Sequence, residues 1–125
     1  MAQTLMIVDD DPQLMRVLSM FFDLEGYHVI QARHGREALD MLQEYSPDII
    51  LLDLMMPEVG GEEVIRQIRA NPKLRHVPVI IFTAAETREE ELTAAGASSF
   101  IAKPFSLNGL LDTVQEAIRT ASPAG

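Results

Sequence analysis

Carboxylates follow two apolar segments of this chain, and their positions suggest chemistry on a phosphoryl group. Asp9, Asp10 and Asp11 come directly after the apolar residues 5–8, and Asp53 follows the aliphatic segment 48–52. Burying a lone carboxylate is costly, so we expect these groups at strand ends or in a polar pocket. Two acidic strand ends in one small domain predict a single site for a divalent cation.

The residue types around this site favour transfer of phosphate to a carboxylate. A hard cation relieves the repulsion between clustered carboxylates, and Mg²⁺ typically takes one or two of them together with phosphate oxygens. Asp53 could then attack phosphorus and form an acyl phosphate. Thr83 and Lys103 follow the next two apolar segments. A hydroxyl and an ammonium group at those places could stabilise the oxygens of the transferring group.

Alternating strand-like and helix-like segments must position these groups. The third strand is apolar on both faces after its first residue, which is typical of a central parallel strand. Helical periodicity follows each strand, and the predicted strands are residues 5–8, 28–32, 48–52, 77–82 and 99–102. Five βα units predict an α/β fold with a doubly wound parallel sheet and helices on both faces. Ligands of such sheets bind beyond the carboxyl ends of the strands.

Local signals mark where several of the helices begin and end. Asp11 before Pro12 has the form of a helix cap followed by a first-turn proline, so we expect Asp11 to cap rather than to bind metal. Ser106 caps the last helix in the same way. Residues 87–90 have the form of a capping box, and residues 71–72, Asn-Pro, end the third helix.

Composition limits the classes of protein to which the chain can belong. It has 125 residues, 47% of them hydrophobic, which fits one domain over residues 1–121 and a frayed tail or linker start over residues 122–125. The net charge of −9 argues against direct binding of nucleic acid. No apolar run approaches the ~20 residues that span a membrane, and the start lacks the basic residues of a signal peptide. A cytoplasmic location is the default expectation.

Five motifs, in order along the chain, resemble the signatures of a response-regulator receiver domain from two-component phosphorelay systems. The resemblance runs from residue 5 to residue 119 or so, and it implies a flavodoxin-like (CheY-like) fold with strand order 2-1-3-4-5. The motifs are Val8-Asp9-Asp10-Asp11-Pro12, Leu51-Leu52-Asp53 with Pro57, Phe82-Thr83-Ala84, Ala95-Gly96-Ala97 and Lys103-Pro104-Phe105.

This resemblance implies a metal site and a phosphoacceptor. Asp53 would accept the phosphoryl group, and Asp9 and Asp10 would form the acidic pocket. Mg²⁺, or Mn²⁺ in its place, would be bound by Asp10, by Asp53 and by the backbone carbonyl of Met55. Asp9 would act on the metal through a water molecule.

The resemblance also implies contacts to the phosphoryl group and a switch. Thr83, Lys103 and the backbone N–H of Ala84 would contact the phosphoryl group, and the Lys103–Pro104 bond would be a cis peptide. Thr83 and Phe100 would form the switch. Phe100 lacks the hydroxyl of the commoner tyrosine, so packing and the movement of Thr83 would have to hold it inward; a plain core role is the open alternative. The segment 83–96 is shorter than is usual in the family.

The implied function is a phosphorylation-controlled signalling module and not an enzyme that turns over an external substrate, although self-phosphorylation and self-dephosphorylation are expected. The implied partners are a sensor histidine kinase or a histidine phosphotransfer protein, and a downstream effector or fused output domain. A homodimer through the face of the fourth helix, fifth strand and last helix is a further expectation. No contact with nucleic acid or a membrane is expected.

Three alternatives stay open on the sequence alone. A degenerate receiver would only bind proteins, but the complete set of site residues counts against it. A phosphatase of the haloacid-dehalogenase type needs an acid two residues after its nucleophile, where this chain has Met55. A flavodoxin-like module for flavin mononucleotide would have its phosphate repelled by the acidic strand ends.

Overall fold

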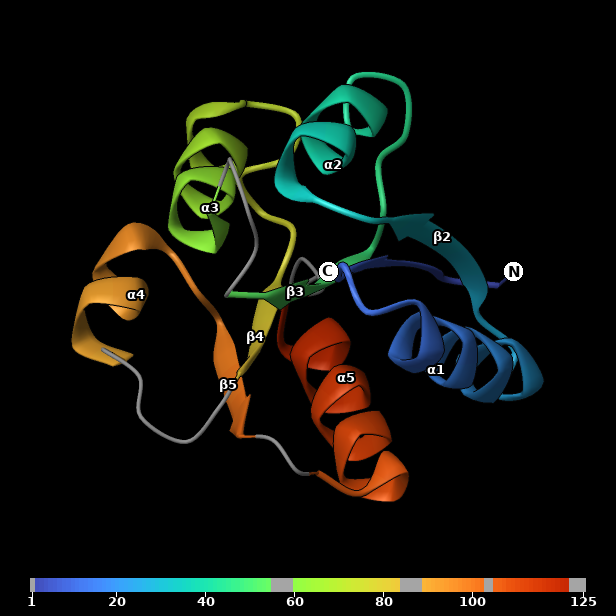
Figure 1. Ribbon diagram of the computed structural model, residues 1–125. Coiled ribbons are helices and arrows are strands. Elements are labelled where there is room, and N and C mark those ends of the chain that lie inside the picture. Colours follow the sequence, from blue (N-terminus) through green and yellow to red (C-terminus); the bar gives the residue numbers. More distant parts are fainter. Residues whose placement is uncertain (1, 55–59, 84–88, 103–104, 122–125) are drawn as a thin grey trace.

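The computed structural model describes residues 2–54, 60–83, 89–102 and 105–121, without the side chains of Thr83, Glu89 and Glu91 (Figure 1). Strands and helices alternate along these residues. They are β1 (Thr4–Val8), α1 (Pro12–Leu24), β2 (His28–Ala32), α2 (Gly35–Met41), β3 (Ile49–Asp53), α3 (Gly61–Ala70), β4 (Val79–Thr83), α4 (Glu89–Ala95), β5 (Ser99–Ala102) and α5 (Leu107–Ala121).

All strand pairs in the sheet are parallel, and the order of the strands is β2-β1-β3-β4-β5. The predicted fold class and strand order are therefore confirmed. Helices α1 and α5 cover one face of the sheet, and α2, α3 and α4 cover the other (Figure 1). Each crossover carries the chain back to the same edge, so the carboxyl ends of all strands point to one side of the molecule.

The central strands divide their side chains between two hydrophobic layers. On β1, Leu5 and Ile7 pack toward α1 and α5, whereas Met6 and Val8 pack toward α2 and α3. All five residues of β3 are buried, as predicted for a central parallel strand. Burial of each such aliphatic side chain stabilises the fold by about 1.5–3 kcal/mol before entropy is counted.

Two strands begin later than the sequence predicts. The predicted third strand starts at Asp48, but β3 starts at Ile49. The Asp48 carboxylate accepts a hydrogen bond from the Thr4 backbone N–H at 2.7 Å. The predicted fourth strand starts at Val77, but β4 starts at Val79. The Val77 N–H donates to the Leu74 carbonyl at 2.9 Å, so Val77 belongs to the turn before the strand.

The predicted helix caps at Asp11 and Ser106 are confirmed. Asp11 accepts hydrogen bonds from the two backbone N–H groups of the first turn of α1, and Ser106 Oγ accepts from Gly109 N at 2.9 Å. Helix α2 has a cap that the sequence reading missed. His34 Nδ1 accepts from Glu37 N at 3.2 Å, and Glu37 Oε1 accepts from the N–H of Arg33, the residue before the cap, at 2.8 Å. The pair resembles a capping box, except that the return bond goes to the residue before the cap. The predicted capping box at residues 87–90 lies mostly outside the described residues.

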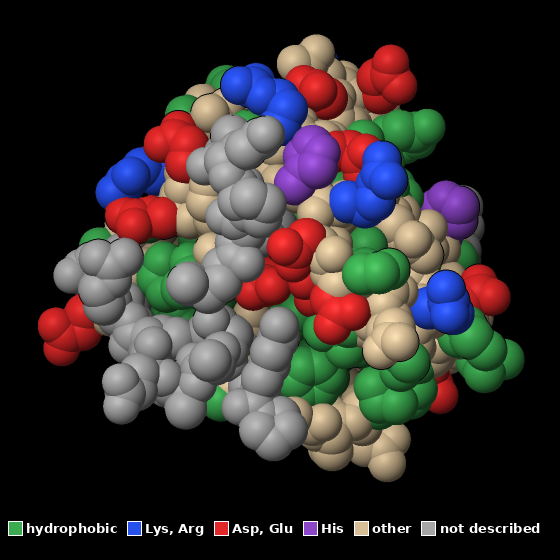
Figure 2. Space-filling view, in the orientation of Figure 1, with side chains coloured by type: hydrophobic (Ala, Val, Ile, Leu, Met, Phe, Trp, Pro, Cys, Tyr) green, Lys and Arg blue, Asp and Glu red, His purple; other side chains and the backbone are tan. Residues whose placement is uncertain are grey.

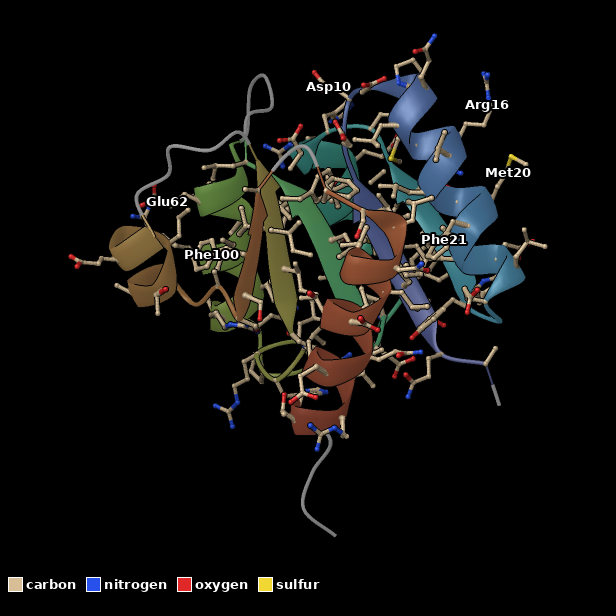
Figure 3. The ribbon with its side chains drawn as sticks, turned by 90° about the horizontal axis from the view of Figure 1, so that it is seen from below. Asp10, Arg16, Met20, Phe21, Glu62 and Phe100 are labelled. Atoms are coloured by element: carbon tan, nitrogen blue, oxygen red, sulfur yellow. The ribbon has the colours of Figure 1, made fainter. Side chains whose placement is uncertain are left out.

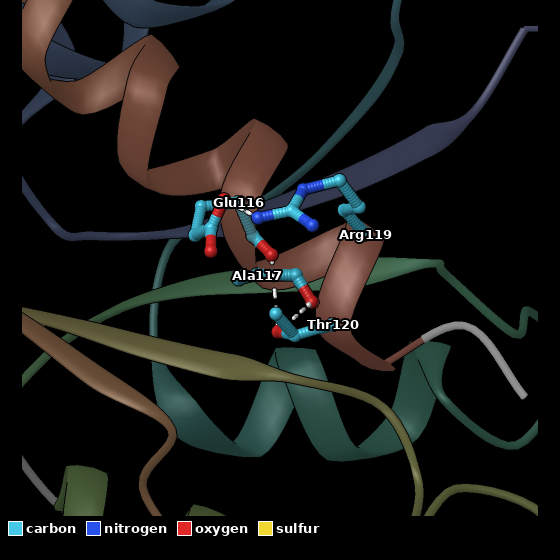
Figure 4. Close-up of polar contacts among 4 residues, drawn as sticks. All are labelled: Glu116, Ala117, Arg119 and Thr120. Carbon is cyan, nitrogen blue, oxygen red and sulfur yellow. Dashed lines mark hydrogen bonds and ion pairs between the residues drawn. The ribbon is translucent and has the colours of Figure 1, made fainter. Parts of the chain in front are cut away.

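The last turn of α5 is held by its own side chains (Figure 4). The Thr120 hydroxyl donates to the carbonyls of Glu116 and Ala117, at 3.0 and 3.2 Å. Arg119 pairs with Glu116, and this hydrogen bond and the charge of Glu116 raise the pKa of Arg119. The pair is exposed, so its contribution to stability is small. In the part of the chain that the structure describes, no helix combines the length and apolar character needed to cross a bilayer.

Candidate metal and phosphoacceptor site

The register of the two central strands brings the predicted carboxylates together. Val8 of β1 lies opposite Leu52 of β3, so the residues that follow them, Asp9 and Asp53, reach the same edge of the sheet. Carboxylate oxygens of Asp9, Asp10 and Asp53 lie within 4.8 Å of one another. The two acidic strand ends therefore form one site, as the sequence predicts.

The three carboxylates differ in burial. Asp9 is 0% exposed and Asp53 is 5% exposed, whereas Asp10 is exposed to solvent. Asp9 Oδ1 accepts a hydrogen bond from Asp11 N at 3.1 Å, which orients the carboxylate from within its own loop. Acidic side chains gather near the middle of the face drawn in Figure 2. A donor set made only of carboxylate oxygens, two of them buried, fits a hard divalent cation.

Asp11 does not belong to this cluster. Its Oδ1 accepts from Gln13 N at 3.0 Å and from Leu14 N at 3.3 Å. The carboxylate is therefore directed at the first turn of α1, where it also interacts favourably with the helix dipole. The sequence prediction that Asp11 caps a helix and does not bind metal agrees with this geometry.

A cavity of about 460 Å³ opens beside the exposed member of the cluster. Asp10 lies near the start of α1, and Arg16 projects outward from the same helix (Figure 3). The cavity is lined by Asp9, Asp10, Pro12, Met15, Arg16, Gln31 and Arg33. A small ligand in this cavity would lie against Asp9 and Asp10 of the cluster.

The remaining predicted contacts are placed only in part. Thr83 ends β4 and pairs with Ala102 of β5, so its backbone lies at the same edge of the sheet as Asp53. Met55, Ala84, Lys103 and Pro104 lie outside the described residues, and so does the predicted cis peptide. Their roles stay predictions.

Phe100 occupies a position between core and surface. It lies on the edge strand β5, is half-buried, and packs against the hydrophobic layer on the side of α3 and α4 (Figure 3). Leu92 and Ala97 belong to the same layer. A half-buried aromatic ring at a sheet edge has room to change its exposure, so both the switch and the core interpretation stay open.

Gly61 lies against the candidate site and was not predicted from the sequence. An added Cβ at Gly61 would lie 3.1 Å from the Leu54 Cα and 3.3 Å from the Asp53 backbone oxygen. The Gly61 N–H donates to the Leu54 carbonyl at 3.4 Å. The absence of a side chain thus lets α3 start directly against the end of β3. The adjacent pair Gly60-Gly61 ahead of a helix was the available signal.

A doubly wound parallel sheet with clustered carboxylates at the ends of β1 and β3 defines a receiver-type α/β domain. The family described as the response regulator receiver domain matches residues 5–115. The chain therefore belongs to this family. It is a receiver domain of two-component signalling, and such domains are generally signalling modules and not turnover enzymes.

Similar proteins of known name agree with this assignment. The chain is 37% identical over 117 residues to the polar-differentiation response regulator DivK of Brucella anthropi, an alignment that covers 92% of this chain and 95% of DivK. It is equally similar to DivK of Brucella ovis, with 37% identity over 117 residues and the same coverage.

Solved structures give the same picture. The signal receiver domain of a signal transduction histidine kinase from Syntrophus aciditrophicus superposes with a TM-score of 0.90 at 30% identity, covering 99% of this chain and 96% of that one. The receiver domain of the sensor histidine kinase PA1611 from Pseudomonas aeruginosa has a TM-score of 0.87 at 30% identity, covering 95% and 99% of the two chains. That structure contains a magnesium ion coordinated in the active site cleft.

Proposed function

We propose that this chain is a phosphorylation-controlled switch that accepts a phosphoryl group on Asp53 in the presence of Mg²⁺. The observation that carries the proposal is the cluster of Asp9, Asp10 and Asp53, whose oxygens lie within 4.8 Å of one another at the carboxyl edge of a parallel sheet. Ligands of doubly wound sheets bind at this edge. Membership of the receiver family supports the same role.

The residues present fit a magnesium ion. Asp10 and Asp53, with the backbone carbonyl of Met55, would hold it directly, and Asp9 would hold it through a water molecule. When bound, Mg²⁺ or Mn²⁺ neutralises charge on the phosphoryl oxygens and on the clustered carboxylates. The magnesium reported for the Pseudomonas aeruginosa receiver domain supports this choice of metal.

The side chains of the site have separate tasks in this proposal. The Asp53 carboxylate attacks phosphorus and becomes the acyl phosphate, while the bond from phosphorus to the donor breaks and the donor leaves as histidine or, from acetyl phosphate, as acetate. Lys103, the Thr83 hydroxyl and the backbone N–H of Ala84 contact the oxygens of the bound phosphoryl group. Thr83 moves toward the phosphoryl group, and Phe100 changes its exposure on β5. The added charge on Asp53 thus biases the conformation of a distant surface.

The partners follow from the same proposal. Membership of the receiver family implies a histidine kinase as partner, and a histidine phosphotransfer protein is the second candidate for the donor. The output is a downstream effector or a fused output domain, and a homodimer would form through α4, β5 and α5. The receiver unit of this proposal spans residues 1–121.

Labelled acetyl phosphate tests the proposal, since a small phosphodonor needs no kinase. The chain should become labelled with Mg²⁺ and lose the label when the metal is chelated. Asp53→Asn should abolish labelling. Asp40→Asn is the matched control, because Asp40 is an exposed carboxylate near the end of α2, away from the site. Circular dichroism should show that both variants are folded.

Two results would count against the proposal. Undiminished labelling of Asp53→Asn would show that another residue accepts the phosphoryl group. A folded wild-type chain that neither takes up label nor shows magnesium-dependent NMR shifts near Asp10 and Asp53 would favour the degenerate receiver.

A further inference from the structure

The Arg69 side chain is bound by backbone segments at the amino ends of the strands, whereas the acidic site lies at their carboxyl ends. Its Nε and one Nη donate to the Gly96 carbonyl at 3.0 and 2.8 Å. The other Nη donates to the carbonyls of Arg75 and Val77, at 3.0 and 2.6 Å. A longer contact, 3.4 Å, reaches Ser98 Oγ. One guanidinium group on α3 therefore joins the segments that lead into β4 and β5.

These interactions hold a cation among neutral oxygens. The five hydrogen bonds recorded for the Arg69 side chain, within the described residues, go to carbonyl and hydroxyl oxygens. Burial lowers the pKa of Arg69, since a charged guanidinium loses solvent there. A charged donor in such surroundings makes strong hydrogen bonds, and the five fixed donors of arginine suit several carbonyls at once.

The turn between α4 and β5 is shaped around this side chain. Gly96 has a φ of +120°, and an added Cβ would lie 2.5 Å from Arg69 Cγ and 2.8 Å from Arg69 Nε. A side chain at position 96 would be strained and would displace the arginine. Ser98 extends the junction, because its Oγ accepts from Val79 N at 3.0 Å and its N–H donates to the Val79 carbonyl at 2.8 Å.

Among its described side chains, helix α4 is attached to the core through Leu92 and Ala95. Leu92 is buried, whereas Glu90, Thr93 and Ala94 are exposed. Gly96 N donates to the Leu92 carbonyl at 3.0 Å, so the arginine acts directly on the last turn of this helix. The carboxyl end of α4 lies at the amino end of β5, and its amino end follows the carboxyl end of β4, where Thr83 lies.

We propose that Arg69 is a positioning residue that fixes the carboxyl end of α4 to α3 and to the starts of β4 and β5. When the acidic site is phosphorylated, the amino end of α4 then moves, and the helix pivots about Gly96. The fixing of α4 is independent of the proposed function, whereas the direction of its response rests on that function.

Amide hydrogen exchange, followed by NMR on the full chain without ligand, tests the fixing of α4. Arg69→Met keeps an unbranched side chain but removes all five hydrogen bonds. It should accelerate exchange at Gly96 and Ala97 by about tenfold or more, because these amides open with the last turn of α4. The exchange rates of amides in α1 and β1 should change only as much as the global stability of the variant changes.

Two controls separate this role from a general loss of stability. Ile65→Val removes a methyl group from the buried face of α3 and should accelerate all amides that exchange by global unfolding alike. Gly96→Ala should reproduce the selective effect of Arg69→Met. Gly60→Ala should not, because an added Cβ there meets nothing within 4 Å. Unchanged protection of Gly96 and Ala97 in Arg69→Met would overturn the proposal, and so would their rapid exchange in the wild-type chain.

Beryllofluoride with Mg²⁺, a mimic of the phosphoryl group, tests the direction of the response. In the wild-type chain, backbone shifts should change in the amino half of α4 and stay small at Gly96 and Ser98. In Arg69→Met the shift changes should extend to Gly96. Labelling by acetyl phosphate should stay within about twofold of wild type, because Asp53 lies at the carboxyl ends of the strands and Arg69 binds at their amino ends. Equal wild-type changes at both ends of α4 would overturn the pivot. A wild-type chain with no response at Asp53 would overturn the proposed function and the pivot, but not the fixing measured without ligand.

Discussion

Three consecutive aspartates in this chain have three different environments. Asp9 is buried under the end of β1, Asp10 faces solvent beside a cavity, and Asp11 caps α1. Identical side chains differ here because the backbone leaves the strand and enters a helix within a few residues. The position of each carboxylate relative to the strand end decides whether it is placed to bind a metal or to cap a helix.

Asp10 and Asp11 provide a matched pair of substitutions for the metal site. Asp10→Asn should weaken Mg²⁺ binding by about tenfold or more, because it removes a charged oxygen ligand. Asp11→Asn should leave affinity within about twofold, since asparagine caps helices as well as aspartate does. Isothermal titration calorimetry measures both affinities, and an equal loss in the two variants would remove Asp10 from the ligand set.

At the scale of elements, the approach of α3 to β3 is set by a residue without a side chain. Gly61 lets the first turn of α3 lie against Leu54 and the Asp53 carbonyl. The same helix carries Arg69 at its other end, where it binds the α4–β5 turn. Helix α3 therefore contacts both ends of the sheet: it lies against Asp53 at the carboxyl ends of the strands and binds the α4–β5 turn at their amino ends.

Gly61→Ala should destabilise the fold by about 1–2 kcal/mol, because the new methyl group forces the helix away from backbone atoms that cannot rotate aside. Gly60→Ala is the control, since its Cβ would lie in open space. Urea unfolding measures the difference. If Gly61→Ala were as stable as Gly60→Ala, the close approach of α3 would not be a constraint on the sequence.

For the whole molecule, the proposed binding of a metal by the acidic cluster would link metal binding to stability. The chain carries a net charge of −9, and part of this charge is concentrated in the cluster of Asp9, Asp10 and Asp53. Unfolding separates these carboxylates and destroys the site. A cation that binds only the folded chain therefore shifts the folding equilibrium toward the folded state.

Mg²⁺ should raise the melting temperature in proportion to the logarithm of its concentration. At a hundredfold excess over the dissociation constant, the gain in unfolding free energy should be about 2.7 kcal/mol. Differential scanning calorimetry measures the shift, with sodium chloride at equal ionic strength as the control. An equal effect of sodium chloride would mean that screening and not binding stabilises the chain.

Most of the fold could be predicted from the sequence because its signals are local. Apolar runs and helical periodicity locate the strands and helices, and β2 and β5 have the predicted bounds. The starts of β3 and β4 could not be predicted. At these starts Asp48 bonds to Thr4 and Val77 lies in a turn, contacts that no local pattern records.

By itself, the sequence predicted Asp9, Asp10 and Asp53 as candidate site residues and placed them after parallel strands. Only the tertiary structure decided that Val8 and Leu52 are in register, which brings Asp9 and Asp53 to one site, and that Gly61 lets α3 approach it. The binding of Arg69 to the turn at Gly96 likewise joins residues far apart in the chain. The physical reason is that residue type and spacing act over a few residues, whereas strand register and side-chain reach are fixed only when the whole core packs.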